Sequence, residues 1–283
     1  MSTLHQLARR VERLEALDAV AKPVAARVRR LLRHRTVRNL LSGTNLGHPL
    51  HPMLTDVPIG AWSMAALLDT VGGRTLAPAA DLLVATGAVA AVPTAASGLN
   101  DWSDTLGAEA RVGFVHAAAN STALCLYLAS LVARLRGRRG AGRVLGLAGL
   151  SVAGAGAYLG GHLGYVRGVN VNRTAWHNPP SEWTPVLPAA ELADRQARRV
   201  ETQGTAVLLY RVDERIHALD AVCSHAGGPL EKGNFDDVCV TCPWHGSTFR
   251  LADGHIERGP ASSPQPVYET RVADGQIQIR ATG

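Results

Sequence analysis

The chain has 283 residues, a net charge of +6 and a hydrophobic share of 46%, and its length predicts about two domains. The four cysteines are too few, and three of them too close together, for a secreted disulfide scaffold. We expect no signal peptide, because the first apolar run begins only near residue 50.

Residues 1–44 form a basic N-terminal segment. Five aliphatic residues in it recur at helical spacing: Leu4, Leu7, Val11, Leu14 and Leu17. This spacing predicts an amphipathic helix that lies on a surface, within residues 4–38. Ten lysines and arginines fall in the first 38 residues. This excess indicates an anionic membrane surface or a cytoplasmic flank, and we expect no nucleic-acid partner.

Four long apolar segments follow, at roughly 53–72, 78–98, 112–133 and 144–166. Each has about 20 residues, which at about 1.5 Å per residue crosses a hydrocarbon core about 30 Å thick. Their many alanines and glycines allow helices to pack closely within lipid. We therefore predict a four-helix transmembrane bundle over residues 45–170, in preference to a soluble helical bundle.

Polar residues inside such segments are costly, and the histidines among them occupy related positions. In four alternating helices, the starts of the first and third and the ends of the second and fourth share one membrane face. His48 and His51 precede the first segment. His116 opens the third segment, and His162 closes the fourth. We expect these histidines to share one face, from which the chain continues to its C-terminal domain.

This histidine face has two interpretations. In the first, His116 and His162 ligate the iron of a haem b or another metal, or the group binds a quinone. In the second, the histidines are interfacial residues satisfied by water and helix-end carbonyls, and the His-Pro pairs simply begin a helix. The sequence leaves both interpretations open.

The arrangement HPLHPMLTDVPIGAW, with a later histidine and GGHLGY, resembles an uncharacterised bacterial transmembrane family that is often fused to a redox domain. The resemblance covers about residues 45–170 and implies the architecture, without an activity. The basic N-terminus predicts that the C-terminal domain is on the cytoplasmic side. The basic loop RLRGRRGAGR lies on the opposite face by parity, and it indicates the reverse orientation.

After a linker at 171–182, residues 183–283 have a different residue pattern. Short alternating or β-branched runs such as TAVLLYRV, STFRLADG and QIQIR are broken by Gly, Asp and Pro. This pattern predicts a small antiparallel all-β domain. Two of its loops each carry one cysteine and one histidine: Cys223 with His225, and Cys242 with His245. We expect the third cysteine, Cys239, to be packed in a strand.

The division of these residues between two loops separates the candidate metal sites. A zinc site would need a pair of cysteines, or a cysteine pair followed by a histidine pair, at close spacing. One cysteine and one histidine from each loop suits a [2Fe–2S] cluster, in which thiolates hold one iron and imidazoles hold the other. Neutral imidazoles leave less negative charge on the cluster than four thiolates, and this raises its reduction potential.

The motif of CSH, sixteen further residues and CPWHGSTF resembles the Rieske iron–sulfur domain, over about residues 183–281. The resemblance implies that Cys223 and Cys242 bind the inner iron. It also implies that His225 and His245 bind the outer, solvent-facing iron. Ser247 matches a serine whose hydroxyl lies near the cluster sulfurs in that family.

Some residues depart from the pattern of high-potential Rieske proteins in cytochrome bc complexes. Those proteins carry an additional cysteine in each loop and join the two in a disulfide, whereas Gly228 and Trp244 stand at these positions here. Phe249 replaces a tyrosine whose hydroxyl lies near the cluster. Each lost hydrogen-bond donor destabilises the reduced cluster. We therefore predict a potential nearer to that of Rieske ferredoxins and oxygenases.

We predict a membrane-bound Rieske protein that transfers single electrons between a partner protein and a haem or quinone in the membrane domain. The alternatives are a redox-sensing or regulatory membrane protein and an electron-donating component of a separate oxygenase. An oxygenase in its own right is not predicted, because its mononuclear iron needs two histidines and a carboxylate. After the cluster motif, His255 is the sole histidine.

Overall fold

The computed structural model describes residues 3–282 and consists of two compact units. The helical unit comprises Met1–His34 and Pro49–Val169, and the β unit comprises Arg35–His48 and Asn170–Gly283. Each unit is thus built from two segments that alternate along the chain. The sequence carried no signal for this alternation, because residues 35–48 resemble the basic segment that precedes them.

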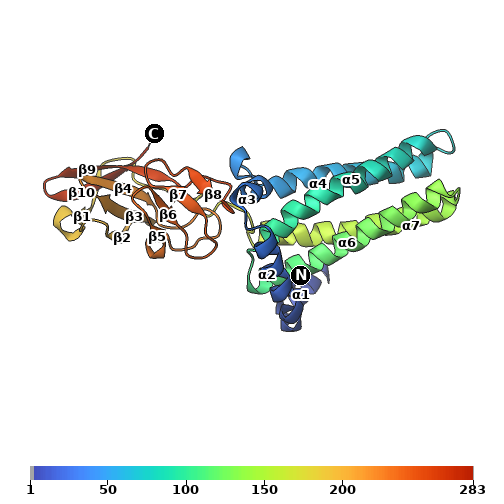
Figure 1. Cartoon of the computed structure of the whole chain (residues 1–283), viewed down its shortest axis with the longest axis horizontal. Helices are drawn as coiled ribbons and strands as arrows, with labels where there is room; N and C mark the ends of the chain where they lie inside the picture. Colours follow the sequence, from blue (N-terminus) through green and yellow to red (C-terminus); the bar gives the residue numbers. More distant parts are fainter. Residues whose placement is uncertain (1–2, 283) are drawn as a thin grey trace. The chain divides into compact units, whose positions relative to one another are not determined.

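Of the seven α-helices among the described residues, six lie in the helical unit (Figure 1): α1 (Thr3–Arg13), α2 (Asp18–Leu31), α4 (Leu50–Val71), α5 (Ala77–Trp102), α6 (Gly107–Leu135) and α7 (Arg139–Gly161). The last four form two antiparallel hairpins, α4 with α5 and α6 with α7. A π-helical turn, His162–Val166, extends α7. Three of the four predicted apolar segments lie within a hairpin helix or its extension, and the first, 53–72, passes the end of α4 by one residue.

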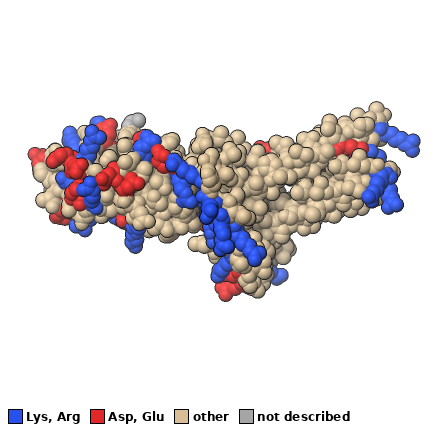
Figure 2. Space-filling model, viewed as in Figure 1, with Lys and Arg blue, Asp and Glu red and all other residues tan. Residues whose placement is uncertain are grey.

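Among the described residues, three helices are long and apolar enough to cross a membrane: α5, α6 and α7 with its extension to Val166. Helix α4 has 22 residues but is not among the three, since His51, Asp56 and Asp69 lower its hydropathy. In Figure 2 the sides of the hairpins show almost no charge, and charged residues gather at their ends. The helical N-terminal region is confirmed, whereas four spanning helices remain a prediction.

The single amphipathic helix predicted over residues 4–38 is divided in the structure. Helix α1 ends at Arg13, a 3₁₀ turn (Glu15–Leu17) follows, and α2 begins at Asp18. The chain changes direction because Ala21 and Ala25 of α2 pack against Trp102 at the end of α5. The aliphatic spacing predicted helix correctly, but it could not show that this packing would break the helix.

The β unit has two antiparallel sheets, which confirms the predicted all-β domain. The six-stranded sheet has the order β1-β10-β9-β4-β3-β2, with β1 (Thr184–Pro188), β2 (Ala197–Thr202), β3 (Thr205–Val212), β4 (Arg215–Asp220), β9 (Val267–Ala273) and β10 (Gln276–Ala281). The four-stranded sheet has the order β5-β6-β7-β8, with β5 (Asn234–Phe235), β6 (Cys239–Thr241), β7 (Thr248–Arg250) and β8 (Ile256–Arg258). Leu208, Leu219 and Phe249 lie in the core of this unit.

Helix α3 (Arg35–Ser42) and the 3₁₀ turn Thr44–Leu46 pack on β8 and the residues after it. The Oδ1 atom of Asn39 accepts a hydrogen bond from Gly259 N at 2.8 Å. Thr44 Oγ1 donates to the carbonyl oxygen of Ala261, also at 2.8 Å. Because both bonds are buried, residues 35–48 belong to the fold of the β unit.

Candidate metal centre

Two loops of the β unit share the same backbone hydrogen bonds. The first loop follows β4 and the second joins β6 to β7. Gly227 N donates to Cys223 O at 2.8 Å, and Gly246 N donates to Cys242 O at 3.1 Å. Both glycines have left-handed backbone, with φ values of 80° and 74°, which other residues rarely adopt. The sequence therefore builds two equivalent turns, each around a cysteine.

The two turns bring the four predicted ligands together. Cys223 and Cys242 are both buried, and a side-chain hydrogen bond joins their sulfurs. The rings of His225 and His245 are half-buried and have centroids 5.1 Å apart, with an angle of 83° between their planes. The site thus has a buried thiol side and a more accessible imidazole side.

Hydrogen bonds prepare one sulfur to bind a metal. The bond from Cys223 and the backbone N–H groups of Trp244 and His245 lower the pKa of Cys242 to about 7. The same contact with Cys242, together with burial, raises the pKa of Cys223. Thiolate is the form that binds iron, and N–H groups directed at a sulfur stabilise it.

The imidazole side also suits a metal ligand. Burial, followed by the nearby His245, Arg38 and Arg173, lowers the pKa of His225 to about 3. The ring is therefore neutral near pH 7, as a ligand must be. Its Nδ1 atom is buried without a hydrogen-bond partner among the described residues, and buried polar atoms usually have one. A metal at this nitrogen would supply the missing partner.

The four donors at the two turns are two thiols and two imidazoles. A [2Fe–2S] cluster with mixed ligands takes only two protein ligands on each iron. The residues present fit such a cluster, with one cysteine pair and one histidine pair.

A buried polar network supports the first loop. Gln265 Oε1 accepts a hydrogen bond from Ser224 N at 2.9 Å, and its Nε2 donates to the carbonyl oxygens of Asp220 and Val222, both at 2.8 Å. Tyr268 donates its hydroxyl to Asp220 at 3.1 Å. Gln265 could not be predicted from the sequence, because it lies 41 residues from Ser224 and no local motif marks it.

The second loop carries the predicted serine. Ser247 is completely buried, and its Oγ atom accepts a hydrogen bond from Ala261 N at 3.0 Å. The hydroxyl hydrogen is then left for a second partner. Phe249 is equally buried but offers no hydroxyl.

A disulfide between the loops is absent. All four cysteines lie in the described part of the chain and are free. A Cβ atom added to Gly228 would lie 2.7 Å from the sulfur of Cys242, so a cysteine at this position could not fit without a shift of the loop. Cys239 is buried in β6, as its position in the sequence predicted.

Three arginines from distant parts of the chain lie at the loops. Arg38 in α3 is only 3% exposed, and its charge acts on His225. Arg173 donates its backbone N–H to Ser224 O at 3.0 Å. Arg258 donates to Gly246 O at 2.7 Å. None of the three could be predicted from the sequence, because each reaches the loops only through the tertiary fold.

The histidines of the helical unit have different partners from those predicted. His162 is buried, and its Nε2 atom lies 2.8 Å from Glu12 Oε1 in α1. His116 instead faces His51, with ring centroids 6.3 Å apart, and its Nδ1 donates to Gly156 O at 2.8 Å. The sequence predicted His116 and His162 as a pair of haem ligands. In the structure His116 faces His51, and His162 contacts Glu12.

The similarity to known families covers both units. Residues 182–269 match the family described as Rieske [2Fe-2S] domain. Residues 47–173 match the family described as Predicted membrane protein (DUF2231).

Among curated proteins, the chain is 31% identical over 98 residues to Ferredoxin CarAc of Metapseudomonas resinovorans, covering 34% of this chain and 92% of the ferredoxin. It is also 31% identical over 100 residues to the anthranilate 1,2-dioxygenase ferredoxin subunit of Burkholderia cepacia. This match covers 35% of this chain and 92% of the subunit. Apoptosis-inducing factor 3 of Mus musculus is 34% identical over 92 residues, but the match covers 32% of this chain and only 15% of that protein.

Among solved structures, a chain in the complex of reduced oxygenase and oxidised ferredoxin in carbazole 1,9a-dioxygenase has a TM-score of 0.35 and 26% identity. The match covers 36% of this chain and 98% of the other. From the two family matches and the ferredoxin relatives, the chain belongs to the Rieske [2Fe-2S] family and joins its Rieske domain to a membrane protein domain of the DUF2231 family.

Proposed function

We propose that this chain is a membrane-anchored electron carrier. Its Rieske domain is homologous to ferredoxin subunits of dioxygenase systems, which supports electron transfer. A bound [2Fe–2S] cluster accepts and releases one electron at a time. One observation supports the proposal most strongly: two equivalent turns bring two cysteines and two histidines close together.

We assign each side chain at the metal centre a role. Cys223 and Cys242 hold the buried iron as thiolates, and their burial supports this choice. His225 and His245 hold the iron nearer to solvent through neutral rings. Ser247 donates its hydroxyl towards a cluster sulfur and stabilises the reduced state.

The anchoring proposal includes α4 as a fourth spanning helix. Two of its polar side chains have partners within the helical unit: His51 Nδ1 lies 2.9 Å from Thr94 O, and Asp69 is paired with arginines. Satisfied polar groups cost less inside a membrane. We propose a basic segment (1–34), a membrane domain (49–170), a linker (171–182) and a Rieske domain (183–283), with residues 35–48 moved from the first two predicted segments to the Rieske fold.

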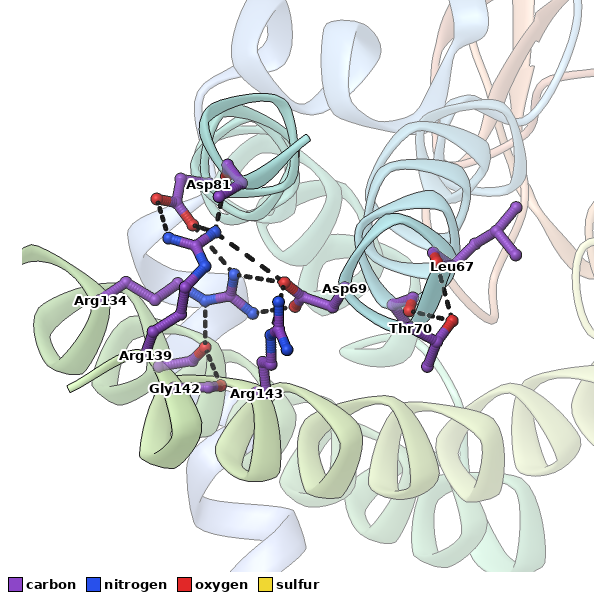
Figure 3. A network of polar contacts seen from close by, with 11 residues as sticks. Leu67, Asp69, Thr70, Asp81, Arg134, Arg139, Gly142 and Arg143 are labelled. Atoms are coloured by element: carbon purple, nitrogen blue, oxygen red, sulfur yellow. Dashed lines mark hydrogen bonds and ion pairs between the residues drawn. The ribbon is translucent and has the colours of Figure 1, made fainter. Parts of the chain in front are cut away.

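We propose that the Rieske domain lies on the cytoplasmic side. The basic loop between α6 and α7 was the signal against this orientation. In Figure 3, three of its five arginines, Arg134, Arg139 and Arg143, form ion pairs with Asp69 and Asp81. Partial neutralisation weakens the loop as an orientation signal, so the basic N-terminal segment has the greater weight.

The partner of the cluster is proposed to be a separate redox protein. Two of the three relatives named above are a ferredoxin and the ferredoxin subunit of anthranilate 1,2-dioxygenase, which supports a protein partner. We further propose that the membrane domain holds a second redox group, a haem or a quinone, in contact with its histidines. A redox sensor remains the alternative, in which the state of the cluster changes the conformation of the membrane domain.

The test uses the full chain, purified in detergent. Iron, zinc and acid-labile sulfide are measured, and the reduced protein is studied by electron paramagnetic resonance (EPR). The proposal expects two irons and two sulfides per chain and rapid reduction by a quinol or a reductase. Zinc in place of iron would exclude the cluster. Reduction with a change in protease sensitivity of the helices, but without onward electron transfer, would favour the sensor.

A further inference from the structure

The two hairpins of the helical unit carry corresponding residues that meet each other. Three pairs lie along α4 and α6: His51 with His116, Trp62 with Tyr127, and Asp69 with Arg134. The ring centroids are 6.3 Å apart in the first pair and 4.1 Å in the second, and the third is an ion pair. In each pair the second residue follows the first by 65 positions.

Helices α5 and α7 repeat in the same way, with an offset of 62 positions. Two glycines in each face the rings of the first two pairs: Gly87 and Gly98 in α5, and Gly149 and Gly160 in α7. A Cβ atom on Gly98 would lie 2.6 Å from Cε1 of His51. A Cβ atom on Gly160 would lie 3.0 Å from Cε1 of His116. The same ring atom therefore faces the corresponding glycine in both hairpins.

Charge distinguishes the two hairpins. The corresponding positions are acidic in the first hairpin, at Asp69 and Asp81, and basic in the second, at Arg134 and Arg143. Asp69 pairs with Arg134 and Arg143, and Arg134 also pairs with Asp81 (Figure 3). Every one of these contacts between the hairpins is attractive. This pattern favours pairing of two different hairpins over pairing of two identical ones.

The three pairs extend over most of a membrane's thickness. From His51 to Asp69 there are 18 positions, roughly 27 Å of helix, against about 30 Å for the hydrocarbon core. The histidine pair thus lies near one end of the hairpins and the ion pairs lie near the other. Transport proteins with parallel repeats place their binding sites at the repeat interface, where the histidine pair also lies.

Hydrogen bonds determine which nitrogen of each ring is protonated. His51 Nδ1 lies 2.9 Å from Thr94 O, and His116 Nδ1 lies 2.8 Å from Gly156 O. A carbonyl oxygen can only accept, so both Nδ1 atoms carry the hydrogen. Both Nε2 atoms therefore present a lone pair, and Thr94 and Gly156 are themselves 62 positions apart.

We propose that the helical unit is a tandem repeat of two hairpins, related by a pseudo-two-fold axis along the helices. We propose further that His51 and His116 on this axis bind one transition-metal ion, either as a bare ion or as the iron of a haem. This inference deepens the proposed second redox group and replaces the pair His116 and His162. It doesn't depend on the presence of the cluster.

The geometry of the pair suits one metal between two imidazoles. Ring nitrogens bind zinc and similar ions at about 2.0–2.1 Å, which places two rings on opposite sides of one ion with centroids about 6 Å apart. The observed distance is 6.3 Å. Metal-bound histidines commonly donate their other N–H to a backbone carbonyl, as both rings do here.

The neighbouring polar groups also allow a metal. Asn120 Nδ2 lies 3.3 Å from both ring nitrogens of His116, and a metal bond would replace its long contact with Nε2. The amide also donates to His116 O at 2.9 Å, so it retains a partner. Two protein ligands suit a cuprous ion, or a haem iron with four porphyrin nitrogens of its own.

The test compares metal binding in the full chain, purified in detergent, and in single variants. Copper, zinc and haem per chain are measured in the isolated protein and after titration with Cu⁺ or hemin. The variants are His51→Gln and His116→Gln, with His162→Gln as the discriminating control and the exposed His34→Gln as the neutral one. The elution profile and thermal unfolding in detergent show whether the helical unit of each variant is folded.

The proposal expects about one copper ion or one haem per chain, lost in His51→Gln and in His116→Gln and kept in both control variants. Visible absorption shows whether the bound metal is the iron of a haem or a bare copper ion. If the bound metal were lost in His116→Gln and His162→Gln but kept in His51→Gln, the assignment of His51 and His116 would be overturned. Equal binding in all variants, or none in the wild type, would overturn it as well. Loss of the cluster signal alone would contradict the proposed function and leave this site standing.

Discussion

Asn39 accepts a hydrogen bond from the backbone N–H of Gly259 at 2.8 Å, across 220 positions of sequence. Between these two residues the chain forms all four hairpin helices. The Rieske fold is therefore completed by a segment that precedes the membrane domain. A fragment that begins after the last membrane helix lacks this segment, although it contains every cluster ligand.

Removal of the Asn39 side chain should destabilise the β unit. Asn39 is 8% exposed and also donates to Glu257 O. We expect Asn39→Ala to lower the free energy of unfolding by about 1–3 kcal/mol, because it leaves a buried N–H group unpaired. Loss of the cluster absorbance in increasing urea measures this effect. The exposed Asn45 lies in the same segment, and Asn45→Ala should change the midpoint little.

The cysteines should differ in their effect on the cluster. We expect Cys223→Ala and Cys242→Ala each to abolish the [2Fe–2S] signal, since each removes a thiolate ligand. Cys239 is similarly buried but lies in β6, outside the two loops. Cys239→Ala should therefore keep two irons per chain. Equal iron loss in all three variants would show that packing, and not ligation, governs the cluster.

The hydroxyl of Ser247 should set part of the reduction potential. A hydrogen bond to a charged group contributes about 1.5–3 kcal/mol, so Ser247→Ala should lower the potential by on the order of 60 mV for a one-electron couple. Phe249→Tyr restores the hydroxyl found in high-potential relatives and should raise the potential. Potentiometric titration measures both. A shift of both variants in the same direction would contradict the role of these hydroxyls.

The buried charge of Arg38 should also raise the reduction potential. Its positive charge acts on His225 and favours the more negative, reduced cluster. We expect Arg38→Gln to lower the potential by tens of millivolts, as for a single charge in partly buried surroundings. Arg198 is exposed on β2, and Arg198→Gln is the matched control. Identical reduction potentials in both variants would show that the charge of Arg38 does not affect the cluster.

The ion pairs at the far end of the hairpins should stabilise the helical unit. The side chains of Arg134 and Asp69 are 1% and 8% exposed. Arg134→Gln should cost about 3–5 kcal/mol, because it removes the nearest cationic partner of the buried Asp69 and leaves only the longer contacts with Arg139 and Arg143. The double variant Asp69→Asn with Arg134→Gln should lose less stability than the two single variants lose in total. Thermal unfolding in detergent gives this comparison, with the exposed Arg136→Gln as control.

Local patterns predicted the elements and the ligand loops. The apolar runs extend over whole helices, and the Cys and His residues of each loop lie within a few positions of one another. Partners far apart in sequence could not be predicted in this way. Gln265 reaches Ser224 across 41 positions, and Arg38 belongs to a segment that reads as part of the basic N-terminus.

The parity of four helices predicted that the histidines share one face, but not the direction in which each side chain points. That direction depends on packing against the neighbouring helix. Gly98 and Gly160 make room for the rings of His51 and His116, and these two rings therefore face each other. His162 is drawn instead to Glu12. Helix rotation is a property of the packed bundle, and no single segment encodes it.

The central claim is a mixed-ligand [2Fe–2S] cluster held by Cys223, His225, Cys242 and His245. A potentiometric titration of the detergent-purified full chain, followed by EPR, tests it most directly. We predict a one-electron transition, two irons per chain and the rhombic signal of a cluster with imidazole ligands, changed or lost in His245→Cys. A zinc-containing or metal-free β unit, or the signal of a cluster with four thiolates, would contradict the account.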